Sequence, residues 1–265
     1  ALTLCLTLVL SLGLSACKQA SQNLVILDES LAEEEYGIGF RKGDVLCDQV
    51  TAALQVLAAD GTLAKISEDW FGSNITTIVP DATALDGIAP EARVFKLGLD
   101  DSFPPMGYKD DQNNIVGFDI DLAKAVCIKL GWELKLVPIQ WDAKEMELNS
   151  GNIDCIWNGM TLTDERKAAM SCTPAYMENK QCIVVKESSG VKTLADLAGK
   201  QLALQAGSSA EDALNAATDF KASLASSSTF ADNMSCFMDL KQGSSDAVLV
   251  DSIVAGWYIK TGKAQ

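Results

Sequence analysis

Strand and helix alternate in two successive blocks of this chain, and this alternation is the feature that most constrains its fold. Apolar segments with strand character occur at residues 95–99, 133–139 and 153–157, with amphipathic segments between them. A second block repeats the pattern with strands at 201–205 and 246–250. Alternation of this kind is typical of sheets covered by helices. The sequence therefore predicts an α/β protein with two lobes.

The residues ahead of the first block predict further elements. Short strands are expected at 23–27 and 36–40, and the acidic run 28–35 between them is expected to be a solvated loop. Residues 45–59 place apolar side chains on one helical face. A second, shorter helix follows and ends at Trp70, Phe71 and Gly72, which reads like the end of a protein although most of the chain is still to come.

Composition excludes several kinds of function. The formal net charge is −15, whereas nucleic-acid binding needs a basic surface. The chain has no histidine, which excludes Ser-His-Asp and Cys-His catalysis and removes the commonest metal ligand. Its eight cysteines include no C-x-x-C pair, which disfavours zinc fingers and thioredoxin-like chemistry. We therefore expect no metal, no cofactor and no nucleic-acid partner.

The first residues have the pattern of a secretion signal. Residues 1–16 are mostly apolar but too few for a comfortable transmembrane helix. The run Leu-Ser-Ala-Cys ends at Cys17 and resembles a bacterial lipobox, in which this cysteine carries lipid. The alternative is an ordinary signal peptide with an unrelated cysteine. We expect a signal peptide over 1–16, a lipid-anchored tether over 17–21, and an extracytoplasmic protein held at the membrane only by that anchor.

Several polar or aromatic side chains follow predicted strands, where α/β sheets bind their ligands. Arg166 could clamp a carboxylate, or could be a solvated helix residue. Ser208 and Ser209 open a helix whose free N–H groups attract anions, although simple capping explains them too. Asp251 could bind an ammonium group or cap the next helix. Phe103 and Trp141 could stack on a ligand or belong to the core, and Asp100 and Asn158 also lie at strand ends. Together the charges fit a zwitterionic amino acid.

Six segments carry a resemblance to a known family. They are GLDDSFPPMGY, IVGFDIDLAKAV, WDAKEMELNSGNID, WNGMTLTDER, LQAGSSAEDAL and DAVLVDS. The chain resembles the extracytoplasmic solute-binding proteins of amino-acid ABC importers, solute-binding family 3. The resemblance implies the type II periplasmic-binding-protein fold, in which two α/β lobes joined by a two-strand hinge close over the ligand like a flytrap.

The resemblance also assigns roles to single residues. Arg166 matches the arginine that clamps the ligand α-carboxylate, and Thr161 and Ser209 match positions that add hydrogen bonds to it. Asp251 matches the carboxylate that pairs with the α-amino group, and Gly159 matches a position that offers its backbone carbonyl. The positions that the resemblance places around the ligand side chain are Asp100, Phe103, Trp141, Asn158 and Gln205.

The order of the segments differs from the family. EYGIGFRKGD and the helix pair that ends in WFG resemble the family's C-terminal end, yet here they precede DSFPP, which resembles its beginning. The chain thus resembles a circular permutant. We expect a continuous lobe 1 over 37–186, containing a linker at 73–92. Lobe 2 is expected to be split between 22–36 and 187–265.

The expected function is binding of a free amino acid between the lobes and its delivery to an ABC permease, by a monomer. The acidity around Asp100 favours a polar or cationic ligand such as Gln, Lys or Arg. Two alternatives stay open: a dehydratase-like enzyme on the same fold, and a sensory ligand-binding module.

Overall fold

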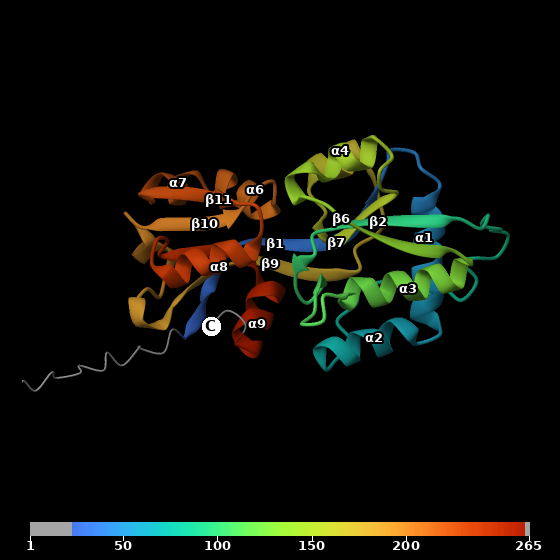
Figure 1. Ribbon diagram of the computed structural model, residues 1–265, viewed down its shortest axis with the longest axis horizontal. Coiled ribbons are helices and arrows are strands. Elements are labelled where there is room, and N and C mark those ends of the chain that lie inside the picture. Colours follow the sequence, from blue (N-terminus) through green and yellow to red (C-terminus); the bar gives the residue numbers. More distant parts are fainter. Residues whose placement is uncertain (1–22, 263–265) are drawn as a thin grey trace, which may run out of the picture.

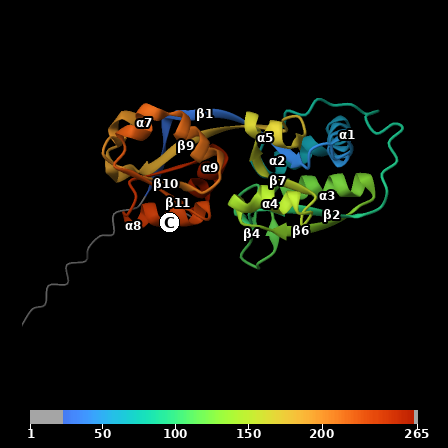
Figure 2. The ribbon, with the colours of Figure 1, turned by 90° about the horizontal axis from the view of Figure 1, so that it is seen from above.

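The structure is a computed structural model that describes residues 23–262, and two lobes make up this part of the chain (Figures 1 and 2). Two long antiparallel strands, β1 (Leu24–Phe40) and β9 (Met177–Lys186), run from one lobe into the other. They belong to one nine-stranded sheet, in which eight strands follow the order β11-β10-β12-β9-β1-β7-β2-β6 and the ninth, β8, pairs with β1 beside this path. The part of the sheet from β1 through β6 forms lobe 1, and the part from β9 through β11 forms lobe 2.

Lobe 1 is a parallel core with helices on its faces. Strand β2 pairs in parallel with both β6 and β7, and β3, β4 and β5 form a small separate sheet. Its elements are α1 (Leu46–Ala59), α2 (Thr62–Phe71), β2 (Val94–Leu99), β3 (Ser102–Phe103), β4 (Gly107–Lys109), β5 (Ile115–Val116), α3 (Phe118–Leu130), β6 (Glu133–Pro138), α4 (Lys144–Asn149), β7 (Cys155–Thr161), α5 (Asp164–Ala169) and β8 (Ser171–Cys172).

Lobe 2 repeats the plan on a smaller scale. Strand β10 pairs in parallel with β11 and β12, and β12 pairs antiparallel with the second half of β9. Its elements are β10 (Gln201–Gln205), α6 (Ser209–Ala216), α7 (Thr218–Ser223), β11 (Ser226–Phe230), α8 (Asn233–Gln242), β12 (Ala247–Asp251) and α9 (Ser252–Thr261). Strand β9, which pairs with both β1 and β12, connects the two lobes.

The early helix pair packs where the sequence places it. The apolar face of α1 is buried, as predicted, and α1 and α2 both lie against α3. Trp70 donates a hydrogen bond from Nε1 to Asp121 (3.0 Å), and the rings of Phe71 and Phe118 lie 5.0 Å apart. Through these contacts the Trp-Phe-Gly end packs in lobe 1, which also contains α5 with Arg166, whereas Asp251 lies in lobe 2.

The acidic run 28–35 is not the loop that the sequence predicts. It continues β1, and Glu33 stands opposite Lys180 of β9 with a salt bridge of 3.0 Å between them. Acidic residues have low strand propensity, but pairing with a long neighbour overrides this weak preference. Residues 73–92, predicted as a linker, contain neither helix nor strand beyond one bridge between Thr76 and Met177.

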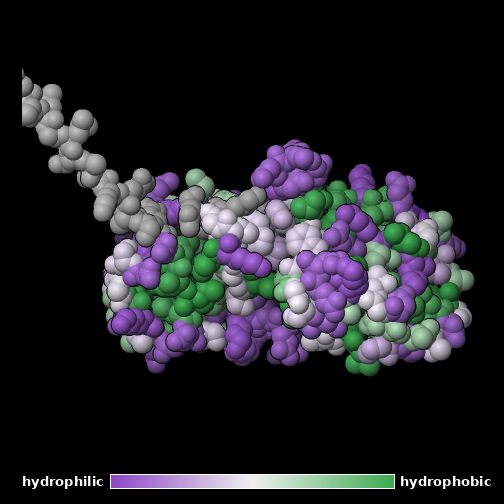
Figure 3. Space-filling view, turned by 90° about the horizontal axis from the view of Figure 1, so that it is seen from below, coloured by the Kyte–Doolittle hydropathy of each residue, from purple (hydrophilic) through white to green (hydrophobic). Residues whose placement is uncertain are grey.

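No helix within residues 23–262 is long and apolar enough to span a membrane. The signal peptide over 1–16, Cys17 and the tether over 17–21 lie outside the described residues. The surface seen from below is mixed, and hydrophilic side chains gather around the junction between the lobes (Figure 3). Large exposed apolar residues such as Ile128 and Val79 are dispersed, which is normal for a globular protein.

Gly117 is required where α3 begins. Its φ of +148° suits glycine alone, and a Cβ there would lie 2.2 Å from the Met106 carbonyl oxygen. Gly131 also has positive φ (+71°), but a Cβ there meets open space. We expect Gly117→Ala to lower the free energy of unfolding by about 3 kcal/mol or more, and Gly131→Ala by about 1 kcal/mol. Urea denaturation measures both, and equal effects would contradict the steric account.

Candidate functional site

A small pocket, called the cavity below, lies where the two lobes meet. Both lobes contribute to its walls. The lining residues are Phe103, Trp141, Gly159, Thr161 and Arg166 from lobe 1, and Gln205, Ser208, Ser209 and Asp251 from lobe 2. The structure thus brings together nine of the positions that the sequence singled out. Asp100 and Asn158 do not line this cavity.

Arg166 is held at the cavity by its own helix and by two carbonyl groups. Thr163 caps α5 by accepting a hydrogen bond from the Arg166 amide (3.2 Å). The guanidinium donates from Nη1 to the Thr161 carbonyl (3.0 Å) and from Nη2 to the Gly207 carbonyl in lobe 2 (3.4 Å). A guanidinium has five N–H donors, so donors remain for an anion. Arg166 is buried and is therefore not the solvated surface residue of the alternative interpretation.

Two hydroxyl groups meet across the cleft beside Arg166. Thr161 Oγ1 and Ser209 Oγ lie 3.0 Å apart. Ser209 is the first residue of α6, while the hydroxyl of Ser208 donates to the Gln205 carbonyl (2.8 Å) and makes no capping bond. The N-terminus of α6 therefore faces the cavity with its N–H groups. Such a helix end favours a negative group.

Asp251 provides the buried negative charge of the opposite wall. Its Oδ1 accepts hydrogen bonds from the Tyr36 hydroxyl (2.6 Å) and from Asn179 Nδ2 (2.7 Å). Burial, followed by the charge of Glu34, raises the pKa of Asp251 to about 7, against the lowering effect of its hydrogen-bond donors. A cation beside this carboxyl group favours its ionised form.

Gly159 lines the cavity from lobe 1 and needs to be glycine. Its φ is +57°, and a Cβ would approach Phe103 Cε1 to 2.8 Å. Its N–H donates to Oδ2 of the buried Asp119 (2.7 Å), which also accepts from the Tyr176 hydroxyl (2.9 Å). These bonds hold the Gly159 peptide group in place at the cavity.

Asp100 and Asn158 form the layer behind the cavity. Gln205, which does line it, donates from Nε2 to Asp100 Oδ2 (2.7 Å), a contact between the lobes. Asn158 Oδ1 accepts from the Asp100 amide (3.0 Å). Desolvation raises the pKa of Asp100 above its ordinary value, although Ser102 and Gln205 oppose the shift. Asp100 can therefore act on a ligand only through Gln205 in this arrangement.

Sequence reasoning missed five polar residues around this site. Lys144 is buried and donates to the Gly207 carbonyl (2.8 Å), and desolvation followed by the charge of Arg166 lowers its pKa. The other four belong to the two long strands: Glu34, Tyr36, Asn179 and Gln181. Two of these residues could have been found from the sequence. Asn179 and Gln181 alternate with charged residues in MENKQ, and this spacing of two places both side chains on one face of a strand.

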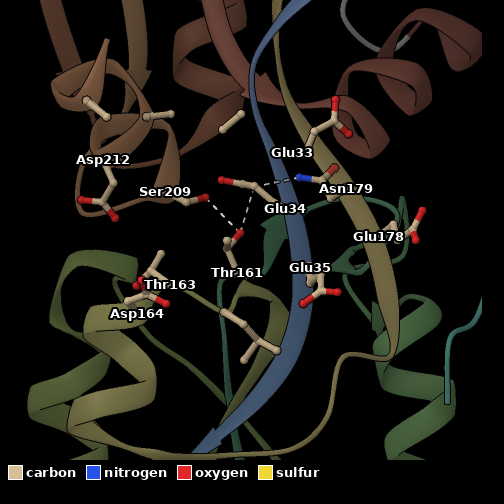
Figure 4. Close-up of a pocket in the computed structure, with 14 residues that line it drawn as sticks. Glu33, Glu34, Glu35, Thr161, Thr163, Asp164, Glu178, Asn179, Ser209 and Asp212 are labelled. Atoms are coloured by element: carbon tan, nitrogen blue, oxygen red, sulfur yellow. Dashed lines mark hydrogen bonds between the residues drawn. The ribbon is translucent and has the colours of Figure 1, made fainter. Parts of the chain in front are cut away.

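Beside the cavity lies an open groove along the two long strands (Figure 4). Glu34 points into it and accepts hydrogen bonds, all on Oε2, from Thr161, Asn179 and Gln181, each at 3.0 Å. Glu33, Glu35, Glu178, Asp164 and Asp212 also line it. No group of three or more metal-ligating side chains stands ready for an ion in the part of the chain that the structure describes.

Comparison with known proteins places this geometry in a family. The profile described as bacterial extracellular solute-binding proteins, family 3, matches residues 95–257, more than half of the chain. The chain belongs to this family. Family 3 proteins are extracellular by this description, which agrees with the extracytoplasmic location expected from the sequence.

Three family 3 members illustrate the similarity. The L-cystine-binding protein TcyJ of Escherichia coli K12 is 32% identical over 60% of this chain and 59% of its own length. The arginine-binding extracellular protein ArtP of Bacillus subtilis 168 is 32% identical over 62% and 64%. A substrate-binding protein of a Streptococcus pneumoniae ABC uptake transporter, solved with histidine, shares 38% identity over 64% and 70%, with a TM-score of 0.63. The chain thus spans about six tenths of the two curated relatives.

The buried Asp119 predicts a pH dependence of stability. Burial raises its pKa to about 7 in the folded protein, whereas an unfolded aspartate titrates near 3.9. The folded state therefore binds the extra proton, and stability falls as pH rises from 5 to 8. We expect Asp119→Asn to reduce this fall by a few kcal/mol, since each pKa unit corresponds to about 1.4 kcal/mol.

Chemical denaturation across this pH range measures the effect. Asp219→Asn is the matched control, because Asp219 is an exposed carboxyl group on α7. Its profile should follow the wild type. An Asp119→Asn profile as steep as the wild-type profile would show that Asp119 is not the titrating group.

Proposed function

We propose that this protein binds one free amino acid between its lobes and delivers it to the permease of an ABC importer. The observation that carries this proposal is the placement of Arg166 and Asp251 on the walls of one cavity between the lobes, one from each lobe. A zwitterion placed between them pairs both of its charges, and buried charges are tolerated only when they are paired. Two relatives are named for binding L-cystine and arginine, and a third was solved with bound histidine. These ligands support the same class of ligand for this protein.

The α-carboxylate is assigned to the side of the cavity near Arg166. The planar guanidinium can bind a carboxylate with two parallel hydrogen bonds. Ser209 and Thr161 supply hydroxyl groups, and the N-terminus of α6 adds N–H donors with the favourable end of its dipole. The α-ammonium is assigned to Asp251 and to the carbonyl of Gly159.

The ligand side chain is assigned to the space beside Gln205, Phe103 and Trp141. Gln205 Nε2 donates both to Asp100 and to the Ala231 carbonyl (3.0 Å), and Oε1 accepts from Asn233 (2.9 Å). Both amide protons are used, whereas an amide oxygen has a second lone pair. This oxygen can accept a hydrogen bond from the ligand. We therefore propose a side chain that donates hydrogen bonds, as those of Arg, Lys, Gln and His do, rather than a carboxylate.

Removal of the guanidinium tests the proposal. Arg166→Ala should weaken amino-acid binding at least 100-fold, because charge-assisted paired hydrogen bonds and a buried counter-charge are both lost. Isothermal calorimetry with a panel of the common amino acids measures this. Arg93→Ala is the control, since Arg93 is half exposed and pairs with Asp154 in lobe 1. Failure of the wild type to bind any member of the panel would refute the function.

We further propose that the chain is a circular permutant of family 3, with lobe 1 over 37–186 and lobe 2 over 22–36 and 187–265. Three features support this. The family profile begins only at residue 95. The earlier helices α1 and α2 complete lobe 1 by packing on α3. Strand β1 and helix α9, far apart in sequence, lie together in lobe 2 (Figure 1).

A rearranged chain tests this proposal. It would run from 93 to 262 and continue, through a short linker, with 23 to 72. Because the linker 73–92 adds no strand or helix, we expect this protein to fold with a melting temperature within a few degrees of the original and to bind the same amino acid. A matched chain reopened inside β7, between residues 157 and 158, should not fold. Failure of the first rearrangement alone would contradict the permutation.

The setting of the protein is proposed from its first residues. Lipid attached to Cys17 of the Leu-Ser-Ala-Cys run would hold the protein at the outer side of the membrane, with residues 17–21 as tether. We propose that it works there as a monomer, because one chain supplies every residue of the cavity.

A further inference from the structure

We propose that Tyr36 and Asn179, one on each long strand between the lobes, are positioning residues that keep Asp251 oriented and ionised for the α-ammonium group. This inference rests on the proposed function, because it assigns Asp251 the ammonium of an amino acid. It adds two residues that the sequence did not single out as part of the site.

The geometry of the two bonds carries the inference. The Tyr36 hydroxyl and Asn179 Nδ2 both donate to the same oxygen of Asp251, Oδ1, at 2.6 and 2.7 Å. Gln181 is a further hydrogen-bond partner that favours the ionised Asp251 carboxyl group, and Asp251 lines the cavity. The two short bonds from Tyr36 and Asn179 therefore fix Oδ1, while the carboxyl group still faces the place of a ligand.

Both donors are themselves fixed. Tyr36 is fully buried, lies opposite Thr161 of β7 and Met177 of β9, and has its ring 6.3 Å from that of Tyr176. Asn179 Oδ1 accepts from the Ser252 hydroxyl (3.1 Å), so its amide nitrogen must point toward Asp251. A group held from both sides loses little freedom when it binds, which is the advantage of a preorganised site.

The electrostatic surroundings explain why two donors are needed. The titratable groups that face Asp251 are Glu34 and Tyr36 on β1, Cys182 on β9 and, through Tyr36, Tyr176. Burial and the charge of Glu34 both oppose the ionised carboxyl group, and the hydrogen bonds from Tyr36 and Gln181 favour it. Without the Tyr36 donor, the carboxyl group should take up a proton at a higher pH and lose its attraction for an ammonium.

The test uses Tyr36→Phe and Asn179→Ala in the full chain. A hydrogen bond to a charged group contributes enough to move a titration by about one pH unit. We expect the titration midpoint of the Asp251 carboxyl group, followed by ¹³C NMR without added amino acid, to rise by about one unit. At pH 7 the affinity for the amino acid found in the panel should fall about fivefold, because the ionised fraction of Asp251 falls by this factor when a pKa of about 7 rises by one unit, and the variant-to-wild-type ratio should recover toward one near pH 9.

The control is Tyr258→Phe, which removes another buried hydroxyl group, one without a hydrogen-bond partner among the described residues. Its midpoint and its affinity should match the wild type. An unmoved midpoint in Tyr36→Phe, or an affinity loss that is the same at every pH, would overturn the inference and leave Tyr36 a core residue. If Tyr36→Phe does not fold, Asn179→Ala decides by the same criteria. Absence of any amino-acid binding by the wild type would refute the proposed function, whereas the NMR midpoint would still decide the role of Tyr36 and Asn179.

Discussion

The antiparallel pairing of β1 with β9 is the interaction on which the rest of the structure depends. Its register runs from Leu24 opposite Lys186 to Tyr36 opposite Met177. Strand β7 attaches to the lobe 1 end of β1, and β12 attaches to the lobe 2 end of β9. The two lobes are therefore two extensions of one ribbon. A shift of one residue in this pairing would turn every side chain to the opposite face.

This register also assembles the site. Tyr36 lies opposite Thr161 on one side of the ribbon, and Asp251 lies opposite Gln181 on the other. Residues from β1, β7, β9 and β12 consequently meet in one polar cluster around Glu34. Such a cluster is unusual in the middle of a sheet, because each buried polar group needs a partner. Gln181 Oε1 has none among the described residues, so the cluster is only partly satisfied, as expected at a functional site rather than in a core.

The sequence predicted those features that local patterns determine. The order of strands and helices follows from apolar periodicity, and nine site positions were found because they follow strands or match family motifs. Asp100 shows the limit of this reasoning: its place at a strand end was correct, but only the fold puts Gln205 between it and the cavity. The role of Tyr36 was out of reach, since its partner Asp251 is 215 positions away in sequence. The acidic run of β1 was misread because pairing, not propensity, makes it a strand.

Closure of the lobes gathers positive charge on one side of the cavity. Arg166 and Lys144, both from lobe 1, donate to the same lobe 2 carbonyl, that of Gly207. The N-terminus of α6 lies just after Gly207 in the chain and adds the positive end of the helix dipole. The negative charges of Glu145 and Asp212 partly offset the positive charge of Lys144, but these two residues do not line the cavity. An anion inside the cavity is thus stabilised most when the lobes are together, because only then do Arg166 from lobe 1 and the N-terminus of α6 from lobe 2 both border it, with Lys144 behind them. Since a ligand shifts a conformational equilibrium by its difference in affinity for the two states, the side of the site proposed for the carboxylate links ligand binding to the contact between the lobes, while the two long strands carry the groups proposed to hold the ammonium.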